Sequence, residues 1–149
     1  MLPGISSLRD VSVDEFLDLE DALPEPIRKR AHHVVTENAR TLAAARALRE
    51  RNLLQFGVLM EASHQSLRDE YEVSCKELDA LTEIAAGMNG EYGSRMTGGG
   101  FGGCAITLVD ARRVEAFVKQ VPKLYKERTG LETEAYLATA EGGAEVTAL

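Results

Sequence analysis

The sequence predicts one α+β domain, in which helices pack on a small antiparallel sheet. Between residues 13 and 88, apolar side chains recur at three- and four-residue steps, as they do on the buried face of a helix. Beyond residue 90 the pattern changes to short β-branched and apolar runs, which are typical of strands. No repeat or linker interrupts the 149 residues, so we expect one domain over residues 1–149.

The first half of the chain predicts a short helix followed by a long one. Ser12 and Glu15 form a capping-box pattern, so the short helix begins at Val13 and fades before Pro24. The long helix extends over Pro26 to Arg51. Its apolar stripe consists of Ile27, Ala31, Val34, Val35, Leu42, Ala45 and Leu48.

Two further helices are predicted before the pattern changes. Asn52 and Gln55 can cap a helix that ends near Asp69, and this helix should lie antiparallel to the preceding one. The tetrapeptide Ser74–Glu77 is a second capping-box pattern. It should begin a helix that stops near Gly87.

Three segments read as strands. Tyr92–Met96 is short and extended, and Cys104–Val109 is an apolar, β-branched run. Glu134–Thr139 could supply a further strand around Tyr136 and Leu137.

One more helix is expected between the second and third of these strands. Asp110 can cap it. Pro122 should kink it if it continues, and Gly130 should end it.

Composition excludes several classes of protein. The chain is 44% hydrophobic and 28% charged, as in an ordinary globular domain. Its 24 acidic and 17 basic residues give a net charge of -7, which disfavours nucleic acid and membrane surfaces as partners. Cys75 and Cys104 form no disulfide pattern, and no targeting or membrane-spanning segment is evident, so a cytoplasmic location is expected.

A glycine-rich run, Gly98–Gly103, is the most distinctive local signal: five of its six residues are glycine. Glycine lets backbone N–H groups approach an anion without a Cβ, so a phosphate cradle is chemically reasonable. A dinucleotide fingerprint would need a helix after the run, where a strand is predicted, and the Lys-Ser/Thr ending of a P-loop is absent. The alternative is a glycine-rich connection between strands that binds nothing.

Three blocks of the sequence resemble galactokinases, which belong to the GHMP kinase superfamily. Residues 93–104, GSRMTGGGFGGC, are similar to the third signature motif of that family. Residues 64–75, HQSLRDEYEVSC, are similar to the segment that galactokinases carry just upstream, and residues 30–35, RAHHVV, to an earlier one. The resemblance extends from about Ser7 to Leu149.

This resemblance implies a galactokinase-like GHMP kinase C-terminal domain with a nucleotide-side phosphate loop. Galactokinases use ATP, with Mg²⁺, to phosphorylate the anomeric hydroxyl of galactose. Galactokinases supply the catalytic aspartate and recognise the sugar from an N-terminal part. That part begins with a Gly-Glu-His-Thr-Asp-type motif and includes a Pro-x-x-x-Gly-Leu-Ser-Ser-Ser phosphate loop, and neither motif occurs here. We therefore expect no catalytic or metal-binding residue, no activity from this chain alone, and weak or no nucleotide binding. The loop candidates are Arg95, Thr97, Gly98, Gly99, Gly100, Phe101, Gly102 and Gly103.

The resemblance also implies partners. A separate N-terminal galactokinase half or a second copy of this chain could complete the protein, and a non-catalytic, galactokinase-like binding or regulatory protein is the alternative function. The family's domain is ferredoxin-like, and its first strand would lie upstream of residue 1, between Cys104–Val109 and Glu134–Thr139. Residues Leu2–Leu8, a rearranged last strand or a second copy could fill that slot.

The remaining ionisable candidates favour structural roles. His32 and His33 point to different faces of one helix, and neither they nor His64 form a metal-ligand pattern. Cys75 and Cys104 are interpreted as small apolar residues. Arg95 stays open, because it could stabilise transferring phosphate charge or form a structural ion pair.

Overall fold

A computed structural model describes residues 4–140, 142, 146 and 147. It confirms the predicted α+β class, with helices packed on a two-stranded antiparallel sheet. In chain order the elements are a 3₁₀ turn (Leu8–Asp10), α1 (Val13–Leu17), a second 3₁₀ turn (Glu20–Ala22), α2 (Ile27–Arg49), α3 (Leu53–Asp69), α4 (Lys76–Ala86), β1 (Glu91–Thr97), β2 (Cys104–Val109) and α5 (Val114–Thr129).

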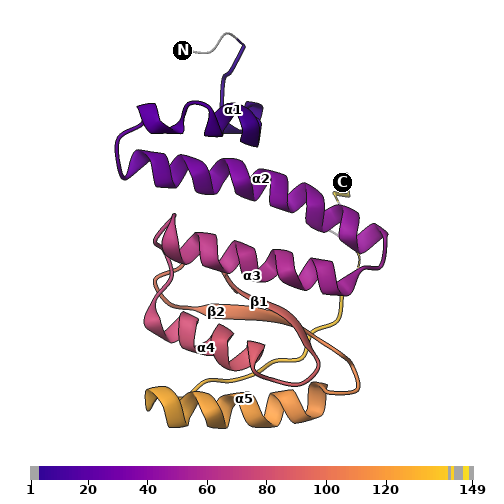
Figure 1. The fold of residues 1–149 in the computed structure, drawn as a ribbon. Coiled ribbons are helices and arrows are strands. Elements are labelled where there is room, and N and C mark those ends of the chain that lie inside the picture. Colours follow the sequence, from indigo (N-terminus) through magenta and orange to yellow (C-terminus); the bar gives the residue numbers. More distant parts are fainter. Residues whose placement is uncertain (1–3, 141, 143–145, 148–149) are drawn as a thin grey trace.

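The elements are stacked in nearly the order of the sequence (Figure 1). α1 packs on α2, α2 on α3, α3 on β1, and α4 against both strands, while α5 lies on the far side of α4. A small apolar cluster of Phe16, Ala31 and Val35 joins α1 to α2. α2 and α3 form the predicted antiparallel pair, so the sheet lies between α3 and α4 (Figure 1).

Two of the predicted helix caps are present as expected. The Ser12 hydroxyl accepts from the Glu15 amide (3.3 Å), and the Glu15 carboxylate accepts from the Ser12 amide (2.9 Å), which completes the capping box. Asn52 Oδ1 accepts from the Gln55 amide at the start of α3 (3.0 Å). Both side chains satisfy amides that have no partner inside the helix.

The predicted capping box at Ser74 and the predicted helix cap at Asp110 are wrong. Cys75 is the N-cap of α4 and makes no side-chain cap, while the Ser74 hydroxyl donates to Asp79 Oδ1 (2.6 Å). α5 begins only at Val114, because Asp110 Oδ1 accepts from the Arg112 amide (2.9 Å) and holds a turn before the helix.

The end of α5 follows the prediction. The helix continues through Pro122 and stops at Gly130, whose φ of 76° is the left-handed conformation of a common helix ending.

β1 and β2 form the predicted hairpin, in the register that pairs Ser94 with Thr107 and Met96 with Ala105. The Met96 amide donates to His64 Nδ1 on α3 (3.2 Å), so it points away from β2. Because antiparallel pairs alternate, the Met96–Ala105 and Ser94–Thr107 pairs are the non-hydrogen-bonded ones. α3 therefore covers the outer edge of β1. The backbone N–H and C=O groups of Ala105 and Thr107 point out of the opposite edge of the sheet, which β2 forms.

The third predicted strand, Glu134–Thr139, is wrong. Residues 131–140 form no strand or helix, and Tyr136 and Leu137 are 83% and 68% exposed. A strand needs a neighbouring strand to pair with, and the sheet of the described residues consists of β1 and β2 alone. The chain's own N-terminal segment does not supply one: its described residues from Gly4 lie beside α1 and α2, while Leu2 and Pro3 fall outside them (Figure 1).

Candidate functional site

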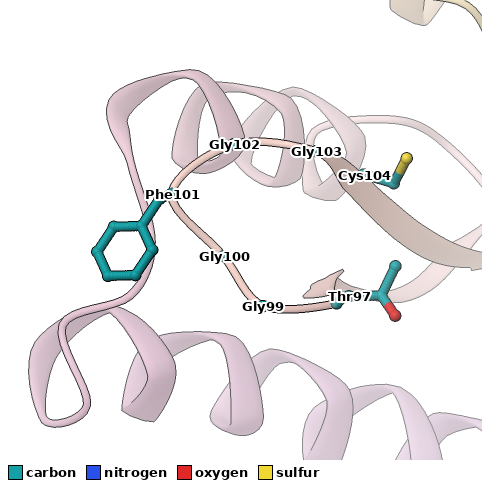
Figure 2. A pocket seen from close by; sticks show the side chains of 8 residues that line it. Thr97, Gly99, Gly100, Phe101, Gly102, Gly103 and Cys104 are labelled. Carbon is teal, nitrogen blue, oxygen red and sulfur yellow. The ribbon is translucent and has the colours of Figure 1, made fainter.

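The glycine-rich loop joins β1 to β2 and lines an open, shallow pocket of about 620 Å³, called the loop cavity below. Its lining consists of Thr97, Gly98, Gly99, Gly100, Phe101, Gly102, Gly103 and Cys104. Figure 2 shows the Phe101 ring at the tip of the loop and the side chains of Thr97 and Cys104 at its base. Backbone rather than side chains therefore forms most of the cavity wall.

Positive φ angles shape this loop. Gly98 (84°), Gly100 (83°), Gly102 (134°) and Gly103 (97°) lie in a region that other residues rarely adopt. Phe101 also has a positive φ, of 58°, and its side chain is 77% exposed. An exposed aromatic residue in the left-handed region is unusual and is typical of functional loops.

A backbone hydrogen bond holds the tip of the loop to the segment that precedes α4. The Phe101 amide donates to the carbonyl oxygen of Val73 (2.7 Å). A Cβ at Gly100 would lie 2.1 Å from that same oxygen, so only glycine fits. At Gly98, Gly99, Gly102 and Gly103 a Cβ would meet no atom within 4 Å.

The remaining loop amides are free to bind an anion. Within the described residues, the N–H groups of the five loop glycines donate no hydrogen bond. Donors left without a protein partner are satisfied by water or by an anion, and consecutive N–H groups in a glycine-rich turn form a favourable anion site. The lining contains no lysine or arginine, so charge attraction at this wall is small.

Arg95 forms the structural ion pair that was one of its two interpretations. Its Nη1 lies 3.6 Å from Glu37 Oε1 on α2, and its Nε donates to the Met96 carbonyl (3.0 Å). Glu37 also accepts from the Ser63 hydroxyl (2.6 Å) and pairs with Arg40. Arg95 does not line the loop cavity, so a part for it in phosphate binding stays a prediction.

The histidines lie between helices rather than in the loop. His33 is 6% exposed, and its Nδ1 is hydrogen-bonded to the Ser66 hydroxyl (2.8 Å). His64 is 5% exposed and contacts β1 and α4. Burial lowers the pKa of both imidazoles, which favours their neutral forms. His32 lies 2.6 Å from Glu70 Oε1.

The two cysteines differ in their surroundings. Cys75 is half-buried at the start of α4. Cys104 is exposed at the base of the loop, so it does not pack in the core as small apolar residues usually do. Both are free thiols.

The described residues offer little to a metal ion. Among them, no group of three or more His, Cys, Asp or Glu side chains is placed to hold a metal. No carboxylate lines the loop cavity, although carboxylates and phosphates are the ligands that Mg²⁺ prefers. In the described part of the chain, no helix is long and apolar enough to cross a bilayer.

Several residues around the loop were not predicted as site residues. Val73 anchors the tip, while Ser74 and Asp79 interact beside it. Val73 and Ser74 belong to the block at residues 64–75, and the resemblance of that block to galactokinases is the sequence signal that connects them with the loop. Contacts across α3, α4 and β1 cannot be read from local periodicity, so their roles emerge only in the fold.

Comparison with known proteins places this geometry in a family. The family model described as GHMP kinases C terminal matches residues 44–127. The galactokinase of Roseiflexus sp. (strain RS-1) is 46% identical over 141 residues, which cover 95% of this chain and 36% of that protein. The galactokinase of Chloroflexus aurantiacus is 48% identical over 142 residues, with coverages of 95% and 36%.

A solved structure gives the same result. The crystal structure of Lactococcus lactis galactokinase complexed with galactose superposes with a TM-score of 0.82 at 48% identity, over 86% of this chain and 33% of that one. This chain thus spans little more than a third of the length of the curated relatives that it matches. The chain belongs to the GHMP kinases, through their C-terminal domain family, and it corresponds to the C-terminal portion of a galactokinase.

Proposed function

We propose that this chain supplies the nucleotide-side wall of a galactokinase active site and acts together with an N-terminal part of the kind its relatives possess. In that role the loop of residues 97–104 contacts the phosphates of ATP, while the N-terminal part provides the sugar site and the catalytic aspartate. The complete protein would transfer the γ-phosphoryl group of ATP to galactose. The free thiols fit a cytoplasmic location, which is part of the same proposal.

The unpaired amides of the loop support this proposal most directly. Loop glycines with positive φ present N–H groups that donate to no described residue, and Gly100 holds the loop against Val73. Such a cradle fits phosphate oxygens. It does not fit a metal ion, because no carboxylate lines it, so we assign Mg²⁺ to no residue of this chain.

Phosphoryl transfer depends on positioning and on charge stabilisation, which half a site does not provide. We therefore expect no galactose phosphorylation by this chain alone. Binding of Mg-ATP should be weaker than micromolar, because one wall without a cation offers few contacts to offset the cost of association. Calorimetric titrations with Mg-ATP and with galactose, performed separately, measure this directly.

A chimera tests the proposal. The C-terminal portion of the Roseiflexus galactokinase is replaced by this chain, and ATP-dependent phosphorylation of galactose is assayed. We expect turnover by the chimera and a large loss of it in the same chimera with Gly102→Val, which adds a side chain to a loop glycine where a Cβ would meet no atom within 4 Å. Turnover by the isolated chain at about 1 to 1,000 per second would refute the proposal. A folded chimera that binds galactose without turnover would favour the non-catalytic alternative.

A further inference from the structure

The role proposed for the loop leaves one sequence block unexplained, namely residues 64–75. His64, the first residue of that block, is almost fully buried between α3, β1 and α4. Its Nδ1 accepts the hydrogen bond from the Met96 amide (3.2 Å), and the Met96 side chain is fully buried. Met96 is the last but one residue of β1, so this bond holds the strand where the glycine loop begins.

The other ring nitrogen of His64 faces α4. His64 Nε2 lies 3.0 Å from Thr82 Oγ1 and 3.2 Å from Asp79 Oδ1. Because Nδ1 accepts a backbone N–H, the proton of the neutral ring resides on Nε2, which donates to these oxygens. The Thr82 hydroxyl donates its own proton to the backbone carbonyls of Leu78 (3.2 Å) and Asp79 (3.0 Å), and so keeps a lone pair for His64.

Asp79 continues this connection towards the tip of the loop. Its Oδ1 also accepts from the Ser74 hydroxyl (2.6 Å), which fixes the segment just before α4. The neighbouring carbonyl of Val73 accepts the Phe101 amide (2.7 Å) and leaves no space for a Cβ at Gly100. The base and the tip of the loop are thus joined through a chain of contacts: Met96, His64, Asp79, Ser74, Val73 and Phe101.

We propose that His64, Asp79 and Ser74 are positioning residues that hold the two ends of the glycine-rich loop in a fixed relation. None of the three lines the loop cavity, so they act through Met96 and Val73. A phosphate cradle requires its N–H groups to be fixed before the anion arrives, since ordering the loop on binding would cost affinity. The benefit for phosphate binding rests on the proposed function. The coupling between the base and the tip of the loop does not depend on it.

Protonation of His64 should break the connection. A second proton can only go to Nδ1, which then ceases to accept from the Met96 amide. The charged groups that face the ring are Asp79 from α4, Arg68 from α3 and Arg95 from β1, and burial lowers the pKa of His64. The neutral, connected form therefore persists at neutral pH and is lost as the pH falls below the ordinary histidine range.

Amide hydrogen exchange of the full chain, followed by NMR, tests the coupling without any ligand. In Asp79→Ala we expect the exchange protection of the Phe101 and Met96 amides to fall. Their loss should exceed that of the Val35 amide in α2 by about tenfold, because one hydrogen bond of the connection is removed. Asp79→Asn retains an acceptor oxygen and should restore most of the protection. His33→Asn is the matched control, because His33 is an equally buried histidine on the α2–α3 side.

The pH dependence of loop protection is a second readout. If His64 only filled space in the core, its protonation would not change this protection. As the pH is lowered from 8 to below the ordinary histidine range, loop protection in the unmodified chain should fall relative to that of Val35. His64→Asn, which keeps an acceptor for the Met96 amide but cannot titrate, should remove this dependence. If a His64 or Asp79 variant does not fold, Ser74→Ala, which changes a half-buried side chain, replaces it.

Equal loss of protection at Phe101 and Val35 in these variants would overturn the proposal, as would the same loop effect in His33→Asn. The chimera assay is independent of this outcome. If the chimera phosphorylates galactose but its loop base and loop tip are not coupled, only the inference about His64, Asp79 and Ser74 is refuted. If the loop base and tip are coupled but the chimera is inactive, only the proposed function is refuted.

Discussion

Gly100 is the loop residue with the tightest structural requirement. It combines a φ of 83° with a missing side chain whose Cβ would lie 2.1 Å from the Val73 carbonyl oxygen. Gly98 has a nearly identical φ of 84° but open space around it. The two glycines therefore separate the cost of backbone strain from the cost of a steric clash.

Replacing either glycine by valine should destabilise the domain. Gly98→Val carries only the strain of a β-branched residue at positive φ, about 1–2 kcal/mol. Gly100→Val adds the clash with Val73 and should cost clearly more. Urea denaturation of both variants measures the difference, and unchanged midpoints in both would contradict the loop conformation.

Glu91 is a second residue whose surroundings have a measurable effect, because its carboxyl group is partly buried and has a raised pKa. Its Oε1 is buried and has no hydrogen-bond partner among the described residues. Burial, with a smaller effect of Glu61, raises the pKa of Glu91 to about 7 from 4.5. Between these two pH values the folded state keeps a proton that the unfolded chain has lost, so this group's contribution to stability falls as the pH rises, and the penalty is complete above pH 7.

Glu91→Gln should remove that penalty. We expect the variant to be more stable than the original chain by about 1 kcal/mol at pH 8, a value that allows for the partial solvent exposure of the side chain. The gain should disappear near pH 4.5. Glu115→Gln, at an exposed ion pair with Lys119, is the control and should show no such trend. A gain that is equal at both pH values would contradict the raised pKa.

At the scale of elements, the backbones of α3 and β1 pack directly against each other. A Cβ at Gly57 would lie 1.5 Å from the carbonyl oxygen of Tyr92, and one at Gly93 would lie 2.4 Å from the Gly57 Cα. These two glycines allow the helix to approach the strand backbone directly. The same approach lets His64, two turns later on α3, reach the Met96 amide.

Gly57→Ala should therefore be far more damaging than an ordinary glycine substitution. Neither backbone can yield without separating α3 from β1, so we expect a loss of about 3 kcal/mol or more. For a chain of this size this lowers Tm by roughly 6–12 °C. Gly99→Ala, where a Cβ meets nothing within 4 Å, should change stability by less than about 0.5 kcal/mol. Similar melting temperatures for both variants would refute the close contact.

The elements also show what could be predicted from sequence. The helices at Val13, Ile27 and Leu53 and the hairpin strands follow from apolar periodicity and local caps, which depend on neighbours in the chain. The cap predictions at Ser74 and Asp110 were wrong because their side chains found other partners: Asp79 in one case and Arg112 in the other. Glu134–Thr139 has a strand-like composition, but strand formation depends on a distant neighbour.

The same distinction applies to the candidate site. The glycine run predicted the loop because its conformation is a property of the glycines themselves. Its anchoring by Val73, and the connection through His64 and Asp79, depend on contacts between α3, α4 and β1. The role of Arg95 could not be decided from the sequence, because its partner Glu37 lies on a helix far away in the sequence.

At the scale of the whole molecule, the two edges of the sheet differ in how they are covered. α3 covers β1, but Ala105 and Thr107 of β2 direct N–H and C=O groups away from the hairpin, and Ile106 between them is 55% exposed. Tyr136 and Leu137 are also exposed. An open strand edge beside exposed apolar side chains is a template for pairing with another strand.

The isolated chain should therefore dimerise at micromolar concentration, with β2 edges pairing between two copies. Light scattering measures the mass, and Ala105→Pro tests the interface. Because the Ala105 amide points out of the hairpin, proline at this position removes an outward donor and leaves the ladder to β1 intact. We expect Ala105→Pro to be a folded monomer and Ala105→Val, which keeps the amide, to remain a dimer. A monomeric parent chain, or a proline variant that stays dimeric, would show that this edge is not the surface through which the copies associate.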